Sequence, residues 1–352
     1  MRVYFDKPNL DSYLSSSIDD EEGFINCNKM LSRYCDIFIN ATEEEMAIDQ
    51  FYGLWVSLLT RKNPDMISPH FNNEFISLDR PIKSRDDFEC KLNLEDNSSI
   101  SLIEGNEIMS LNGNYLINEG NELNTLLSLR FKNEDKPYLD YLPIHTYFED
   151  EAWSILNKYS LPCSDIIISD QFVLSDPTKI ESSLCSLIKT LAPKEEFSHV
   201  NIVILTLLKS EKVEGSKETK YSEYDWNDIR DKIKSTLNEY EITANVSFVA
   251  PSNKHIFREH DRTIFTNYRF YTPGMGVGIY DANGKNSTFG RHFYVHSMVE
   301  KDNYSAAFDF INDMQAVIDT ILGKKRRSGK NKFYGVINVE LTTKPCNYLK
   351  LV

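Results

Sequence analysis

The stretch from Asp165 to Asp170, which reads DIIISD, decides how the second half of the chain is interpreted. Three consecutive isoleucines between polar ends are typical of a strand that is buried on both faces of an α/β sheet. An amphipathic helix pattern follows over Pro177–Leu191, and a second apolar run covers Val200–Leu208. Strand, helix and strand in this order predict a parallel crossover unit.

The same alternation continues toward the C-terminus. We expect further elements at Tyr224–Tyr240 (helix), Val246–Val249, Thr263–Thr266 and Phe293–Val295 (strands), and Tyr304–Leu322 (helix). The sequence therefore predicts an α/β domain over residues 145–352, with a mainly parallel sheet and helices on both faces. Ligands bind such sheets at the carboxyl ends of the strands. Asp170, at the end of the first strand, is thus a candidate binding residue.

The charge of the chain is unevenly distributed. Residues 1–150 hold 28 Asp and Glu against 13 Lys and Arg, whereas residues 151–352 hold 25 against 26. An acidic surface binds phosphate backbones and anionic lipids poorly, because both require cations. We therefore expect a nucleic acid to bind the second half and a protein partner to bind the first.

Residues 1–144 predict an acidic, mainly helical α+β interaction domain. The expected elements are helices over Leu10–Ile18, Phe24–Ile39, Thr42–Leu59 and Glu122–Leu129, and short strands over Ile100–Ile103 and Tyr115–Ile117. The third helix begins with a capping box between Thr42 and Glu45. Its apolar residues are so dense that we expect it to be buried on most sides.

The segment from His260 to Gly276 carries a spaced motif. His260, Arg262, Asn267 and Gly274 stand where the phospholipase D superfamily has His, Lys, Asp and Gly. The resemblance covers roughly residues 145–322 and implies a single phospholipase D-like lobe. In that family the imidazole attacks phosphorus, a cation binds the phosphate oxygens, a carboxylate orients the ring, and no metal takes part.

The resemblance implies roles for these residues and for a second copy of the chain. His260, Arg262 and Asn267 become catalytic candidates, and Asp261 and Gly274 become binding candidates. In that family a second His, from another copy of the motif, protonates the leaving group. Because this chain has one copy of the motif, activity implies a homodimer. Arg262 keeps the charge of the family's Lys, whereas Asn267 lacks the carboxylate that orients the ring. The run His260-Asp261-Arg262 is also similar to that of a non-catalytic phospholipase D-like domain, which follows microtubule-interacting and trafficking modules.

Two further signals lie in the second half. Arg291 and His296 match the spacing R-H-x-x-x-H, which resembles the motif of the helical HEPN ribonucleases, although the intervening Phe-Tyr-Val favours a strand. The only concentrated basic block contains Lys324, Lys325, Arg326 and Arg327. It is a candidate nucleic-acid contact, and alternatively a solvated loop or a nuclear localisation signal.

Other classes of function have no motif in the sequence. The N-terminus lacks a signal-peptide core, the longest apolar stretch is too short to span a bilayer, and the six cysteines lack zinc-type spacing. We expect a cytoplasmic protein with reduced thiols and with no metal or cofactor.

These observations favour a divergent phospholipase D-like protein that recognises the phosphodiesters of nucleic acid. Its activity would be that of a metal-independent nuclease in a bacterial defence or surveillance system. One alternative is a non-enzymatic adaptor or scaffold subunit of a larger complex. The second alternative is a HEPN-type ribonuclease that acts through Arg291 and His296.

Overall fold

The computed structural model divides the chain into two compact units. Unit 1 comprises Met1–Leu139 with Ser297–Lys301, and unit 2 comprises Asp140–His296 with Asp302–Val352. The sequence predicts the boundary after residue 144, where the strand and helix alternation begins, and the compact units divide after Leu139. The structure describes residues 2–15, 24, 25, 28, 31, 32, 36–62, 69–71, 100–102, 109–111, 114–117, 139–142, 153–159, 163, 165–192, 199–212, 214, 219–240, 242–252, 262–267, 269–274, 276–286, 293–297, 301–325, 335–340, 346 and 349–351.

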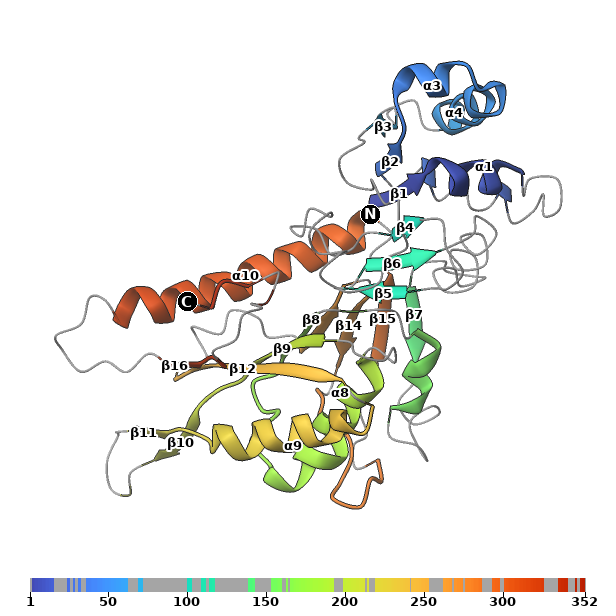
Figure 1. The fold of residues 1–352 in the computed structure, drawn as a ribbon. Coiled ribbons are helices and arrows are strands. Elements are labelled where there is room, and N and C mark those ends of the chain that lie inside the picture. The colour runs from blue at the N-terminus through green and yellow to red at the C-terminus, as the bar shows by residue number, and fades with distance from the viewer. Residues whose placement is uncertain are drawn as a thin grey trace. The chain divides into compact units, whose positions relative to one another are not determined.

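Unit 2 is built on an eight-stranded sheet with the strand order β16-β12-β9-β8-β13-β14-β15-β7 (Figure 1). Its strands are β7 (Leu139–Leu142), β8 (Asp165–Ser169), β9 (His199–Leu205), β12 (Thr243–Pro251), β13 (Thr263–Thr266), β14 (Arg269–Pro273), β15 (Phe293–Ser297) and β16 (Gly335–Asn338). Strands β8, β9 and β12 are parallel neighbours, and every residue of β8 is buried, as its isoleucine run predicts.

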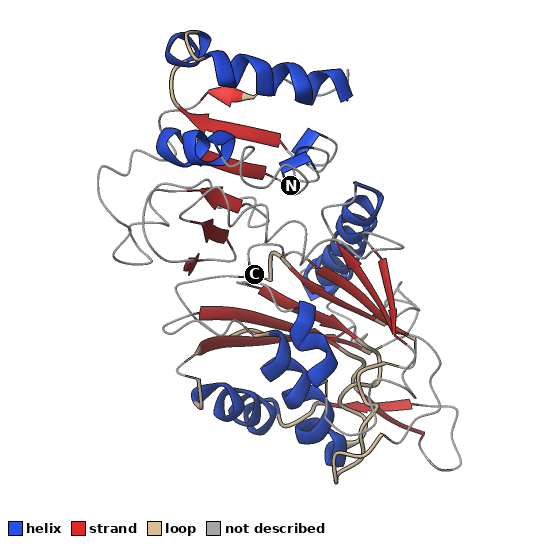
Figure 2. Ribbon diagram, turned by 90° about the vertical axis from the view of Figure 1, so that its right-hand side faces the viewer, coloured by secondary structure: helices blue, strands red, loops and turns tan. Residues whose placement is uncertain are grey.

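Helices cover both faces of this sheet, which confirms the α/β class (Figures 1 and 2). They are the short 3₁₀ helices Ser154–Tyr159 and Pro177–Lys179, the π-helical segment Ile180–Cys185, and the α-helices α8 (Ser186–Leu191), α9 (Trp226–Asn238) and α10 (Lys301–Lys325). Helices α8 and α9 lie on one face, where Trp226 stacks on Phe248 of β12. Helix α10 lies on the other face, where the rings of Phe270 and Phe310 are 6.0 Å apart. A separate antiparallel hairpin, β10 (Lys209–Lys212) and β11 (Thr219–Ser222), follows β9.

The sheet is mixed, whereas the sequence pattern suggested a mainly parallel one. Strand β13 runs antiparallel to β8 and to β14, and β16 runs antiparallel to β12. The lengths of the connections explain this difference. Only residues 267 and 268 join β13 to β14, which is a hairpin link, whereas a parallel pair needs a crossover of about a dozen residues or more.

Unit 1 contains a six-stranded sheet in the order β3-β2-β1-β4-β6-β5, whereas only its strands at Ile100–Ile103 and Tyr115–Ile117 were expected from the sequence. The strands are β1 (Arg2–Asp6), β2 (Asp36–Asn40), β3 (His70–Phe71), β4 (Ile100–Leu102), β5 (Met109–Leu111) and β6 (Asn114–Ile117). All pairs are parallel except that of β5 and β6. The helix expected over Phe24–Ile39 does not reach Ile39, because the last residues of that range belong to strand β2. Ile37 and Ile39 of this strand are buried.

The helices of unit 1 are α1 (Lys7–Ser15), α3 (Glu43–Ala47) and α4 (Gln50–Lys62). The capping box is confirmed: the Glu45 amide donates to the Thr42 hydroxyl at 3.1 Å, and the Thr42 amide donates to the Glu45 carboxylate at 2.9 Å. The single helix expected over Thr42–Leu59 is interrupted at Asp49, whose carboxylate accepts the amides of Phe51 and Tyr52 and starts α4. The expected helix over Glu122–Leu129 lies outside the described residues.

Membrane-spanning helices were also sought. Within the described ranges, no helix combines the length and the apolar character that crossing a bilayer would require.

Candidate functional site

The carboxyl ends of β8, β9 and β12 form one edge of the unit 2 sheet, and backbone hydrogen bonds tie this edge together. The Asp170 amide donates to Leu205 O at 3.0 Å, and the Thr206 amide donates to Val249 O at 3.0 Å. Because β13 is antiparallel to β8, its first residues reach the same edge, next to the end of β14. We call this the carboxyl edge.

Asp170 occupies the centre of the carboxyl edge. Its side chain is buried, with Oδ1 accepting the Phe172 amide at 2.9 Å and Oδ2 accepting the Val277 amide at 2.9 Å. Burial raises the pKa of Asp170 above its ordinary value, while the two amides and the cation of Arg262 act in the opposite direction. The carboxylate therefore depends on these three partners to stay ionised.

Arg262 supplies the cation beside Asp170. Its Nε lies 3.4 Å from Asp170 Oδ1, and its Nη1 donates to Gly274 O at 3.3 Å. The Arg262 side chain is 28% exposed, so part of the guanidinium faces solvent while the rest is fixed by these two contacts. A guanidinium held in this way presents N–H donors in one orientation, which suits a phosphate or carboxylate ligand.

Gly276 allows the chain to pass close to this pair. Its φ is +90°, and a Cβ at this position would lie 2.6 Å from Arg262 Cδ and closer still to Asp170 Oδ2. Only glycine meets both conditions, since other residues rarely adopt positive φ and their side chains need space. The same loop is anchored further along, where the Tyr280 amide donates to Ser183 Oγ at 3.0 Å and Ser183 Oγ donates to Tyr280 O at 3.1 Å.

The start of the basic block lies toward the same edge. A Cβ on Gly335 would lie 2.8 Å from Pro251 Cα and 3.0 Å from Ile321 Cδ1, so the last turns of α10 lie near the carboxyl end of β12. Lys324 and Lys325 end this helix. Three strand spacings, each about 4.8 Å, separate β12 from β13, so the end of β12 lies on the order of 14 Å from the start of β13 along the edge.

The structure brings together three residues that the sequence singled out, namely Asp170, Arg262 and Gly274. It does not bring Asn267 to them: Asn267 follows the far end of β13, where its buried side chain accepts the Asp165 amide at 3.2 Å. Asn267 is therefore placed to support the backbone at the opposite edge. His260, Asp261, Arg291, Arg326 and Arg327 lie outside the described residues.

His296 lies on strand β15, not on the helical turn that the HEPN-like alternative requires. Its Nε2 is 3.2 Å from the Thr272 hydroxyl, and the ring is half-buried. Burial lowers the pKa of His296 and outweighs the opposing hydrogen bond with Asn303. The neutral ring is thus favoured, and no described neighbour supplies it with the catalytic geometry of that family.

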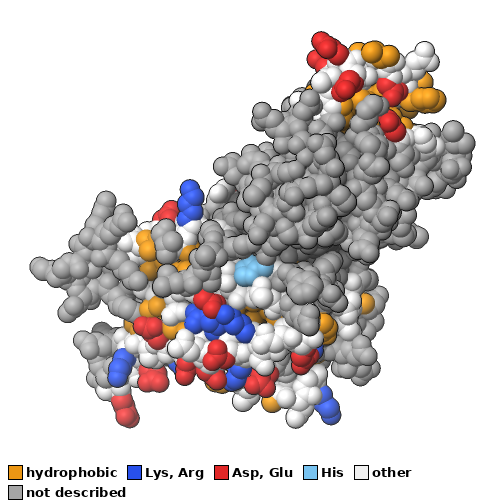
Figure 3. Space-filling model, viewed as in Figure 1, with side chains coloured by type: hydrophobic (Ala, Val, Ile, Leu, Met, Phe, Trp, Pro, Cys, Tyr) orange, Lys and Arg blue, Asp and Glu red, His pale blue; other side chains and the backbone are white. Residues whose placement is uncertain are grey.

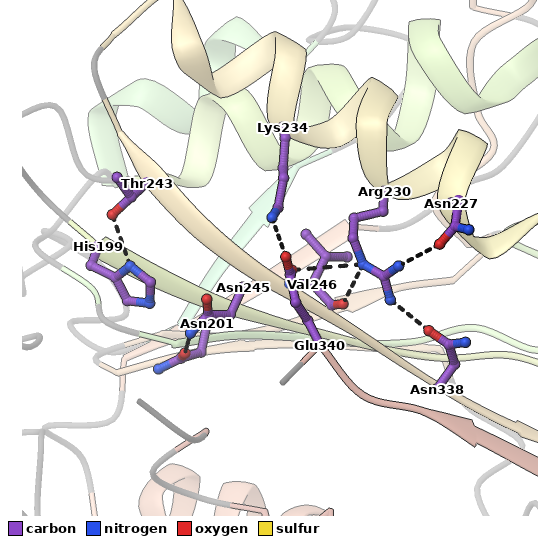
Figure 4. Close-up of polar contacts among 10 residues, drawn as sticks. All are labelled: His199, Asn201, Asn227, Arg230, Lys234, Thr243, Asn245, Val246, Asn338 and Glu340. Carbon is purple, nitrogen blue, oxygen red and sulfur yellow. Dashed lines mark hydrogen bonds and ion pairs between the residues drawn. The ribbon is translucent and has the colours of Figure 1, made fainter. Parts of the chain in front are cut away.

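A polar network on α9, β12 and the residues after β16 was not found from the sequence (Figure 4). Glu340 pairs with Lys234, lies 3.6 Å from Arg230 Nε, and accepts the Val246 amide at 3.0 Å. Arg230 also donates to Asn338 at 2.5 Å and to Val246 O at 3.1 Å. Arg230 and Lys234 are four residues apart on α9 and share a face, but nothing in the sequence indicates that Glu340 is their partner.

The opposite edge of the sheet carries neutral polar pairs (Figure 4). His199 Nδ1 is 2.8 Å from Thr243 Oγ1, and Asn245 donates to Asn201 at 3.0 Å. These pairs lie at the amino ends of β9 and β12 and join neighbouring strands. We assign these contacts to strand alignment.

The described residues contain no group of three His, Cys, Asp or Glu side chains that could hold a metal ion. Cys163 and Cys185 are buried and unpaired with another cysteine, in keeping with small core residues. Burial raises the pKa of the Cys185 thiol to about 11, so the thiolate needed for nucleophilic attack is not formed near neutral pH.

Two comparisons with known proteins were made, and neither found a match. No protein-family model matches the chain. A search of curated proteins finds no significant match.

Proposed function

We propose that unit 2 recognises phosphodiesters at the carboxyl edge, as a divergent relative of a single phospholipase D-like lobe. The observation that carries the proposal is the partly exposed Arg262 guanidinium, fixed by Asp170 and by Gly274 O. The pair itself is electrically neutral, so Arg262 alone gives a weak anion site. A second cationic region at the same edge, which begins at Lys324 and Lys325, makes a ligand with repeated negative charges the better fit.

The ligand class follows from charge and shape. A nucleic-acid strand carries a negative charge at each phosphate, and its affinity for proteins comes largely from Lys and Arg contacts. A ligand that reaches from Arg262, at the start of β13, to the end of β12 spans on the order of 14 Å, which an extended polyanion can do and a single phosphate group cannot. The exposed β10–β11 hairpin leaves β9 at this edge and adds Lys209, Lys212 and Lys220.

We propose recognition without cleavage. In the family's mechanism the orienting group must lie within hydrogen-bond reach of the attacking imidazole, and the cation must contact the phosphate that this imidazole attacks, so the two groups must lie around one phosphate. Arg262 and Asn267 flank β13 at opposite ends, on the order of 17 Å apart at about 3.3 Å per residue. Arg262 is moreover already paired with a carboxylate of its own chain.

The test measures binding and cleavage of labelled single-stranded DNA, double-stranded DNA and single-stranded RNA of 20 nucleotides, in EDTA. The proposal predicts that Arg262→Gln weakens binding at least fivefold. The matched control is Lys189→Gln, which removes another cation with one carboxylate partner, Glu239, from α8. Since Arg262→Gln leaves Asp170 buried without its cation, the double variant Asp170→Asn with Arg262→Gln repeats the measurement.

The binding and cleavage results of these proteins distinguish phosphodiester recognition from the alternatives. Loss of binding in both Arg262 variants and retention in the Lys189 control supports recognition at the carboxyl edge. Equal binding by all four proteins refutes it. Cleavage in EDTA that disappears in His260→Ala refutes the non-catalytic reading and requires a homodimer.

A second candidate function is a protein adaptor without a nucleic-acid ligand. It is favoured by the Arg262–Asp170 pair, because a cation that is already neutralised can serve the fold alone. The adaptor reading predicts that none of the three oligonucleotides binds at 100 mM salt.

A further inference from the structure

Helix α4 of unit 1 carries a row of exposed apolar side chains, which the sequence suggested would be buried. Phe51, Leu54 and Leu58 are 70%, 65% and 44% exposed, and Ile48, in the turn before the helix, is 84% exposed. Positions i, i+3 and i+7 share one face of a helix, so the three helical residues form a stripe. We call these four residues the α4 stripe.

The α4 stripe runs beside a second, buried stripe on the same helix. Tyr52, Trp55 and Leu59 are buried, and at 100° per residue they occupy the neighbouring sector of the helix. Trp55 Nε1 donates to Asn28 Oδ1 at 2.7 Å, which also accepts the Tyr13 hydroxyl at 2.9 Å. These bonds fix the rotation of α4, so the exposed residues cannot turn into the core.

The surroundings of the stripe are acidic. From Asp36 to Leu59 the chain holds five acidic residues and no Lys or Arg, and the first basic residues that follow are Arg61 and Lys62 at the far end of α4. Glu43 and Glu44 are exposed on α3, and Asp49 stands between Ile48 and α4. Figure 3 shows these acidic and apolar side chains gathered on one surface over α3 and α4.

We propose that the α4 stripe docks a basic amphipathic helix of a partner protein. Apolar residues on one face of the partner helix would cover Phe51, Leu54 and Leu58, and Lys or Arg along its flank would face Glu43, Glu44 and Asp49. This is the helix-on-helix mode of recognition, in which spaced apolar anchors supply affinity and flanking charges select the partner.

Charge also argues against an anionic lipid surface as the occupant, since such a surface attracts Lys and Arg rather than Glu and Asp. A basic helix, in contrast, would be attracted by these acidic side chains.

The probe is a labelled 18-residue helix built from Leu and Lys with its leucines on one face, compared with the same helix in which Glu replaces Lys. Binding to the full chain is measured by fluorescence anisotropy. We expect the Leu–Lys helix to bind at least tenfold more tightly than the Leu–Glu helix. The double variant Phe51→Ser with Leu54→Ser should weaken binding of the Leu–Lys helix at least tenfold, because central apolar anchors dominate such interfaces.

The matched control is Tyr221→Ala, which removes an exposed ring from β11 in unit 2. It should leave binding of the Leu–Lys helix within twofold of the unsubstituted chain. A second variant, Glu43→Lys with Glu44→Lys, keeps the stripe and reverses its rim. It should weaken the Leu–Lys helix and strengthen the Leu–Glu helix.

Five results would overturn the proposal, four of them from the measurements above and one from a vesicle assay. The first four are failure of the Leu–Lys helix to bind, equal binding of both helices, binding unchanged by the Phe51/Leu54 variant, and a stable dimer that this variant converts to a monomer. The fourth result would assign the stripe to a second copy of the chain. Binding of the chain to phosphatidylserine vesicles that depends on Phe51 would assign it to a membrane surface and would likewise refute the partner helix.

Discussion

The carboxyl edge depends on the close passage of Gly276, and Gly276→Ala tests this dependence. A Cβ at position 276 would lie 2.6 Å from Arg262 Cδ and 2.8 Å from Arg262 Nε, with the Asp170 carboxylate also in its way. The loop must therefore move, and the Val277 amide must leave Asp170 Oδ2. Two terms add: the strain of an alanine at φ +90°, and the loss of a hydrogen bond to a charged group.

The size of each term can be estimated separately. Alanine at positive φ costs about 1 kcal/mol. A hydrogen bond to a buried carboxylate contributes about 1.5–3 kcal/mol. We therefore expect Gly276→Ala to lower the free energy of unfolding of unit 2 by about 2.5–4 kcal/mol, which corresponds to a fall in Tm of roughly 10 °C for a unit of this size.

Gly284→Ala is the matched control, because Gly284 has a φ of +75° and open space around its Cβ position. This variant keeps the strain term and lacks the steric term, so it should cost only about 1 kcal/mol. The assay is urea unfolding followed by tryptophan fluorescence in a Trp55→Phe background. Two of the three tryptophans, Trp153 and Trp226, then report unit 2 alone. Equal destabilisation by the two glycine variants, within about 0.5 kcal/mol, would refute the packing described for the carboxyl edge.

Further predictions concern the supports of each unit. Glu340→Gln should destabilise unit 2 by about 2 kcal/mol in urea unfolding, because it removes the charge that pairs with Lys234 and Arg230. Burial acts to raise the pKa of Glu340, but its hydrogen bonds and these cations outweigh burial and hold the pKa below its ordinary value. The unsubstituted chain should therefore keep the extra stability above pH ~4.5 and lose it as the pH falls through the folded-state pKa. The Gln variant should show no such loss. Asn28→Ala should cost about 2–4 kcal/mol by leaving two buried donors without an acceptor, with a red-shifted Trp55 emission, and an unchanged spectrum and stability would count against that network. Thr42→Ala should cost only about 1 kcal/mol, through loss of the capping box, and a neutral effect would contradict the cap.

The central elements of unit 2 could be predicted from the sequence because their signals are local. The isoleucine run of β8, the amphipathic pattern of α9 and the long pattern of α10 each decide one element without reference to the rest of the chain. Strand direction was harder, since it depends on the connections between strands. The two residues between β13 and β14 indicate a hairpin, and that signal outweighs the βα alternation around it.

Helices α1, α3 and α4 and strands β4 and β6 of unit 1 were expected from the sequence, but strands β1, β2, β3 and β5 and the mostly parallel sheet were missed, for a physical reason. Strands β1 and β2 are five residues long, and short apolar runs do not distinguish a strand from the end of a helix. Their sheet is formed by pairing between distant segments, as when Val3 pairs with both Ile37 and Ile100. The exposure of the α4 stripe was missed in the same way, because a dense apolar helix gives no sign of which side the chain covers.

The candidate site shows both the strength and the limit of sequence reasoning. Asp170 was singled out because it ends a buried strand and Arg262 because of its place in the spaced motif, and the two form an ion pair. Asn267 was singled out by its spacing from Arg262 alone. Because β13 is an extended strand, that spacing carries Asn267 to the opposite edge of the sheet.

The salt dependence of oligonucleotide binding tests the central proposal most directly. The dissociation constant of a labelled 20-nucleotide single strand is measured between 50 and 300 mM NaCl for the unsubstituted chain, Arg262→Gln and Lys189→Gln. If Arg262 contacts a phosphate, its loss should reduce the slope of log K against log salt by about 1, and the Lys189 variant should keep the full slope. Identical slopes for all three proteins would contradict a phosphodiester contact at Arg262.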